Sequence, residues 1–79
     1  MLNNKLLEIL EDYKQEKKHI DYKDLMELLK TDESIVFFVN LSMSAIRVYS
    51  KRFNCHIYNI IFDELGDYDF IIIKDIVRV

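Results

Sequence analysis

Apolar residues in the first third of the chain recur every three or four positions, the spacing that places side chains on one face of a helix. The first stripe lies between Leu2 and about Lys18 and comprises Leu2, Leu6, Ile9, Leu10 and Tyr13. The second ends near Thr31 and comprises Tyr22, Leu25, Met26 and Leu29. Asp21 stands directly before it, and aspartate is a favoured N-cap residue. The pattern predicts two short amphipathic helices that form an N-terminal helical hairpin.

The pattern changes at Ser34. Residues Ile35 to Val39 are apolar throughout and are branched or aromatic, which favours a buried strand. Periodicity alone does not separate such a run from a short buried helix, so the helix stays open as the alternative. After this run, Ser42 and Ser44 are candidate N-caps for a helix that ends at Asn54. Its buried face would carry Ala45, Ile46, Tyr49 and Phe53.

The last third of the chain predicts a β-hairpin. Residues His56 to Phe62 and Asp69 to about Arg78 are rich in branched and aromatic side chains, and they flank a polar loop with Gly66, a residue that tolerates positive φ. We therefore expect an α+β fold: the helical hairpin, then a small, largely antiparallel sheet of about three strands with one helix inserted between strands 1 and 2. A winged helix-turn-helix is the alternative fold.

Composition indicates a small folded protein. The chain has 79 residues, of which 51% are hydrophobic and 32% charged, and a formal net charge of -3. We expect one domain over residues 1–79. Cys55 is the single cysteine, and neither a signal peptide nor a membrane span is visible, so we expect a cytoplasmic protein without membrane contact. The bias toward lysine, isoleucine and asparagine is typical of an AT-rich genome, and a phage or mobile element is a plausible source.

Candidate chemistry is sparse. Cys55 and His56 are adjacent, and neighbours on a strand point to opposite faces, so they do not form a dyad with each other. The acids around Gly66 do not match the calcium-loop spacing. With two histidines, one cysteine and one glycine, the sequence shows no zinc cluster, phosphate loop or dinucleotide fingerprint. We expect no enzyme activity, no catalytic residues, no metal and no cofactor.

One basic stretch stands out in this acidic chain. The residues from Ser44 to Phe53, Ser-Ala-Ile-Arg-Val-Tyr-Ser-Lys-Arg-Phe, resemble recognition helices of small bacterial helix-turn-helix regulators. The resemblance implies a recognition helix over Met43 to Phe53 that contacts DNA. Its outward residues would be Arg47, Ser50, Lys51 and Arg52. The first helix of such a motif would carry Val36, Phe37 and Phe38 where a polar outer face is usual, and the net negative charge disfavours phosphate binding.

Surplus acids suggest a different partner. We expect a small acidic interaction protein that binds a larger host or cognate protein and modulates it, as an inhibitor, because acids complement a basic groove. The candidate contact residues are Glu8, Glu11, Asp12, Glu16, Asp63, Glu64 and Asp67. The apolar C-terminal strand from Asp69 to Val79 further suggests a homodimer that pairs through this strand. Nucleic acid is a partner only under the helix-turn-helix alternative.

Overall fold

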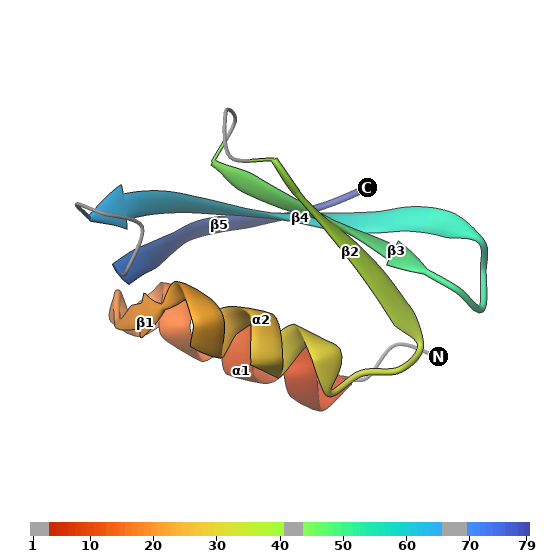
Figure 1. Ribbon diagram of the computed structural model, residues 1–79, viewed down its shortest axis with the longest axis horizontal. Helices are drawn as coiled ribbons and strands as arrows, with labels where there is room; N and C mark the ends of the chain where they lie inside the picture. Colours follow the sequence, from red (N-terminus) through yellow and green to blue (C-terminus); the bar gives the residue numbers. More distant parts are fainter. Residues whose placement is uncertain (1–3, 41–43, 66–69) are drawn as a thin grey trace.

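The fold is α+β, with two helices packed on one face of a curled five-stranded antiparallel sheet (Figure 1). The computed structural model describes residues 4–40, 44–65 and 70–79. In chain order the elements are α1 (Asn4–Glu16), β1 (His19–Asp21), α2 (Tyr22–Lys30), β2 (Ile35–Asn40), β3 (Ala45–Ser50), β4 (Cys55–Leu65) and β5 (Phe70–Arg78). The strand order is β1-β5-β4-β3-β2, so sequence neighbours are sheet neighbours from β2 to β5.

Both helices form where the apolar stripes predicted them. Asp21 caps α2, since its Oδ1 accepts a hydrogen bond from the Lys23 backbone N–H at 2.8 Å. The expected helical hairpin is wrong, however, because the connection is a strand and not a tight turn. β1 pairs antiparallel with β5, Ile20 opposite Ile71, and the Ile20 side chain is buried. Burial of Ile20 against the sheet gives this short linker a structural role of its own.

The helix expected between Ser42 or Ser44 and Asn54 does not form, because Ala45–Ser50 is strand β3. Its side chains alternate: Ile46, Val48 and Ser50 are buried, Arg47 is exposed and Tyr49 is half-buried. The recognition helix over Met43–Phe53 and the winged helix-turn-helix fold are therefore wrong. A strand forms because β3 lies between β2 and β4 and hydrogen-bonds to both, which satisfies its backbone on two sides. Ser42 lies outside the described residues.

The remaining strand predictions are confirmed, but the sheet has five strands and not about three. Ile35–Asn40 is strand β2, and the C-terminal hairpin consists of β4 and β5. Gly66 lies outside the described residues. The turn between β3 and β4 contains Asn54 at a φ of 51°, a conformation that asparagine tolerates better than most residues.

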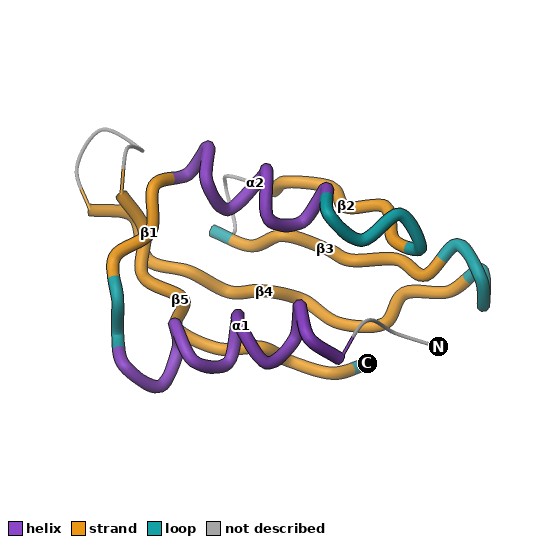
Figure 2. The backbone as a smooth tube through the Cα atoms, turned by 90° about the horizontal axis from the view of Figure 1, so that it is seen from below, coloured by secondary structure: helices purple, strands orange, loops and turns teal. Residues whose placement is uncertain are grey.

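The core lies between the helices and one face of the sheet. α1 and α2 lie on that face and extend roughly along the strands (Figure 2), with α1 near β5 and α2 near β2. The side chains that are at most 1% exposed come from both layers: Leu10, Leu25, Leu29, Ile46, Val48, Ile60, Phe62, Ile71 and Ile73. Burial of one such side chain contributes about 1.5–3 kcal/mol. No helix among the described residues is long and apolar enough to cross a membrane.

Candidate protein-binding surfaces

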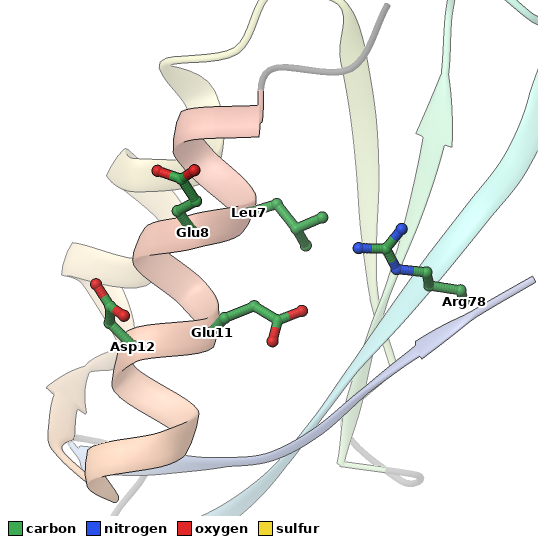
Figure 3. A pocket seen from close by; sticks show the side chains of 5 residues that line it. All are labelled: Leu7, Glu8, Glu11, Asp12 and Arg78. Carbon is green, nitrogen blue, oxygen red and sulfur yellow. The ribbon is translucent and has the colours of Figure 1, made fainter.

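Three of the acids proposed from sequence lie together on α1. Glu8, Glu11 and Asp12 line a surface pocket of about 400 Å³ with Leu7, and Arg78 from the end of β5 forms the opposite wall. Figure 3 shows that Leu7 and Glu11 point toward Arg78, whereas Glu8 and Asp12 project from the other side of the helix. Within the described part of the chain, none of these charged groups forms a salt bridge. The pocket therefore combines an exposed acidic rim with one cation.

The other described acids of the set do not line this pocket. Glu16 pairs with Lys18 at 2.7 Å, and this hydrogen-bonded carboxylate raises the pKa of the Lys18 ammonium. Asp63 lines another surface pocket together with the cations Lys14, Lys17 and Lys74.

Glu64 is partly buried, and its Oε1 has no hydrogen-bond partner among the described residues. Burial, and then the charge of Glu64, raise the pKa of Tyr22. Asp67 lies outside the described residues. Among the described acids of the set, Glu8, Glu11 and Asp12 therefore share one pocket, whereas Glu16, Asp63 and Glu64 do not line it.

A second candidate surface is the open face of the sheet, which we define as the side away from α1 and α2. Phe38, Tyr49 and His56 form an aromatic cluster there, one residue from each of β2, β3 and β4. The Phe38 and Tyr49 ring centroids are 5.6 Å apart at 88°, and the Tyr49 and His56 centroids are 5.1 Å apart at 28°. Edge-to-face and stacked pairs are favourable beyond the area that they bury. The cluster is therefore a preformed aromatic surface.

Strand register builds this cluster. Val36, Tyr49 and His56 lie opposite one another across β2, β3 and β4, and Phe38 lies opposite Arg47 in the next row. Directly opposed side chains share one face of a sheet. Phe38 is 57% exposed and Val36 37% exposed, and no described segment covers them.

His56 is held in place by the sheet. Its Nε2 lies 2.8 Å from Asn59 Oδ1 and 3.2 Å from the Tyr58 carbonyl oxygen. Both partners are acceptors, so Nε2 carries the hydrogen and donates it. The ring orientation is thereby fixed for stacking on Tyr49.

The residues proposed for DNA contact are separated by the strand. Arg47 is exposed on the open face, while Lys51 and Arg52 are exposed in the turn after β3. Ser50 is 4% exposed, and its hydroxyl accepts a hydrogen bond from the Phe53 N–H at 3.1 Å. Ser50 therefore shapes the turn and offers no surface for DNA.

Titratable groups near the core serve the fold. Asp32 is buried and accepts hydrogen bonds from both the backbone N–H and the hydroxyl of Ser34. Burial, with a smaller contribution from the Asp32 charge, raises the pKa of Tyr58 to about 12. Cys55 lies opposite Ser50 and His56 opposite Tyr49, which places the two neighbours on opposite faces. The described residues contain no group of three side chains suited to a metal ion.

Sequence reasoning missed the aromatic cluster. Arg47 and Tyr49 alternate with Ile46, Val48 and Ser50, a period of two that marks a half-buried strand. The same segment also satisfies the helical spacing of Ala45, Ile46 and Tyr49, which is why the sequence predicts a helix there. Once β3 is assigned as a strand, its outward residues identify the open face.

No protein-family model, curated protein sequence or solved structure matches this chain.

Proposed function

We propose that this protein is a small non-enzymatic binding module that attaches to a larger protein through the open face of its sheet and modulates that protein, as an inhibitor. The observation that carries the proposal is the exposed aromatic cluster of Phe38, Tyr49 and His56. Contiguous apolar side chains on a small domain are typical of interaction sites. Interface cores are enriched in aromatic residues and arginine, which is the composition of this cluster with its neighbour Arg47.

Preorganisation supports this role. The cluster residues stand on three adjacent strands, and the ring contacts and the His56 hydrogen bonds hold their side chains in place. A partner then binds without much loss of side-chain freedom, which lowers the cost of association. Full burial of an exposed phenylalanine contributes about 1.5–3 kcal/mol. The best complement is a protein surface with an apolar group opposite Phe38 and a carboxylate opposite Arg47.

The acidic pocket offers an alternative contact for the same function. Glu8, Glu11 and Asp12 belong to α1, and α1 lies on the side of the sheet opposite the open face (Figure 1). A partner that binds only the open face does not contact these acids. Variants of the two surfaces therefore separate the two contact modes.

The test compares matched surface variants as tagged bait. Phe38→Ala alters the open face, and the double variant Glu8→Gln/Glu11→Gln alters the acidic pocket. We expect both variants to fold. A protein that the wild type recovers in stoichiometric amount should not be recovered by Phe38→Ala, and should still be recovered by the acidic variant. Calorimetry with the purified pair should then show a 1:1 complex that Phe38→Ala weakens at least about tenfold, the effect of losing roughly 1.4 kcal/mol. Loss of binding with the acidic variant alone would move the contact to α1, and the absence of any stoichiometric partner would reject the function.

Single-stranded nucleic acid is a second candidate ligand. The specific observation is that Arg47 lies beside Phe38 and Tyr49 on an open sheet, because bases stack on aromatic rings and arginine neutralises phosphate. The net charge of -3 opposes it. Fluorescence anisotropy with single-stranded and duplex oligonucleotides at about 50 mM salt decides the matter. Binding that falls with Arg47→Ala would support nucleic acid, and no change in anisotropy would remove it.

A further inference from the structure

The two outer edges of the sheet differ in their protection. On one side, β1 pairs with Phe70–Ile72 of β5. Beyond β1, the Asp75 Oδ1 accepts a hydrogen bond from the Ile76 N–H at 2.8 Å, and Lys14 of α1 lies 3.4 Å from the same oxygen. A charged side chain that occupies an edge N–H is a common guard against strand pairing. The β5 edge is therefore blocked.

The opposite edge, formed by β2, is open. The Lys51 N–H donates to the Ser34 carbonyl at 2.8 Å, which sets the alternation of the ladder between β2 and β3. By that alternation, the backbone groups of Phe37 and Val39 point away from β3. These groups have no hydrogen-bond partner among the described residues. The Ile35 carbonyl points the same way, whereas the Ile35 N–H donates to the Asp32 carbonyl at 3.3 Å.

The side chains of β2 do not hinder strand pairing at this edge either. The stretch from Ile35 to Val39 contains no charge and no proline. Val36, Phe38 and Val39 are 37%, 57% and 38% exposed. An uncharged apolar edge strand of this length is a strong site for strand addition.

We infer that β2 is a dimerisation edge, and that β2 of a second copy of this chain pairs with it antiparallel about a two-fold axis at Phe37. This register places Phe37 opposite the partner's Phe37 and Ile35 opposite the partner's Val39, with their outward backbone groups facing each other. Val36 then lies opposite the partner's Phe38 on the open face. It is the register in which all five apolar residues from 35 to 39 oppose one another.

The backbone geometry and the charges fit a second copy. The two Phe37 residues exchange two hydrogen bonds, and each Val39 N–H donates to an Ile35 carbonyl, which adds two more. Antiparallel pairing about a two-fold axis keeps the helices of both copies on the same face of one continuous sheet. β2 has no acid that would attract a basic peptide, and no like charges meet between the two β2 strands.

The homodimer expected from sequence uses the C-terminal strand, whereas the dimer inferred here uses the opposite edge of the sheet. The inference does not rest on the proposed function, since the readout is the oligomeric state of the purified protein. Light scattering and sedimentation of the wild type in the micromolar range should report a dimer. A monomer at every concentration would overturn the inference.

Val39→Pro tests the edge without changing the internal ladder. Proline removes an N–H that points outward, and the β2–β3 hydrogen bonds remain. We expect circular dichroism to show a folded protein whose dimer dissociation constant rises at least about tenfold, because two of the four intermolecular hydrogen bonds are lost. Val39→Ala is the control, since it shortens the same side chain but keeps the N–H, and it should remain a dimer. An unchanged dimer in a folded Val39→Pro protein would place the contact elsewhere.

Charge pairing tests the register. In the double variant Val36→Lys/Phe38→Lys, lysines oppose each other across the seam, so a monomer is expected. In Val36→Glu/Phe38→Lys, each glutamate opposes a lysine of the other copy, so a dimer should return and weaken with added salt. Equal behaviour of the two double variants would reject the register at Phe37.

Discussion

The two faces of this sheet carry similar residue types, but one face forms the core and the other is exposed to solvent. On the face under the helices, Ile60 and Phe62 are 0% exposed and pack against leucines of α1 and α2. On the open face, Phe38 and Val36 are exposed to solvent, and the Phe38 ring contacts Tyr49. Aromatic and branched residues thus occur on both faces. Those that α1 and α2 cover are buried and stabilise the fold, whereas those on the open face remain exposed. The comparison implies that substitutions on the covered face act on stability and those on the open face act on binding.

The largest contrast is expected between two phenylalanines. Phe62→Ala removes a fully buried ring that also contacts Tyr22 edge-to-face, and should lower the unfolding free energy by about 3–5 kcal/mol. Phe38→Ala should lower it by less than about 1 kcal/mol, since much of that ring is already in water. Urea denaturation of the two variants at a concentration that keeps the oligomeric state constant measures the difference. Equal losses would show that the open face is covered in the native protein.

The next largest effect is expected from alkaline pH, which should destabilise the fold through Tyr58, a buried residue of the covered face. The pKa of Tyr58 is about 12 in the folded protein, against an ordinary value of 10 in the unfolded chain. The folded state therefore holds the Tyr58 proton more tightly than the unfolded chain does. Tyr58 does not change the unfolding free energy below about pH 10, and its ionisation in the unfolded chain lowers that free energy as the pH rises to about 12. The two-unit difference corresponds to roughly 2–3 kcal/mol. Denaturation between pH 9 and about 12 should show a shallower loss in Tyr58→Phe, and parallel curves would contradict the assignment.

A smaller loss is expected at the loop that leads from α2 into β2. Asp32→Ala leaves the Ser34 N–H without its carboxylate partner and should cost about 1–2 kcal/mol. Glu33→Ala is the control, since Glu33 is exposed and should change stability by less than about 0.5 kcal/mol. Thermal unfolding of both variants gives the comparison. A silent Asp32→Ala would mean that the loop does not depend on this buried carboxylate.

The smallest effect on folding is expected on the open face itself. Arg47→Ala should leave the unfolding free energy within about 0.5 kcal/mol of the wild type, because Arg47 is exposed and forms no salt bridge among the described residues. It should nevertheless weaken the partner complex when measured by calorimetry. Lys51→Ala, in the turn beside β3, is the matched charge control. A loss of folding stability with unchanged binding would reverse the roles assigned to the two faces.

Local signals predicted the helices and the β4–β5 hairpin well. The leucine spacing of α1 and the Asp21 cap of α2 act within a few residues, so the sequence displays them directly. β1 and β3 were missed for different reasons. His19–Asp21 is too short to show a period and is a strand because β5 lies beside it. Ala45–Ser50 satisfies both the helical and the strand spacing, and it forms a strand because it pairs with β2 and β4.

The candidate surfaces were less predictable. The proximity of Glu8, Glu11 and Asp12 was predictable because one turn of α1 brings them near one another. Glu16 and Asp63 were grouped with them on charge alone, yet each lies beside lysines. The aromatic cluster depends on the pairing of three strands, a long-range fact that no local pattern contains.

The sequence by itself determined that this acidic chain is an α+β protein with two amphipathic helices and a C-terminal hairpin, because periodicity and capping act over a few residues. It favoured a strand at Ile35–Val39 but left a short buried helix open there. Tertiary structure alone decided that the segment around Arg47 is a strand, that Phe38 meets Tyr49 and His56, and that one edge of the sheet is guarded while the other is open. These features arise from strand order and register, which are fixed by burial of one face against the helices.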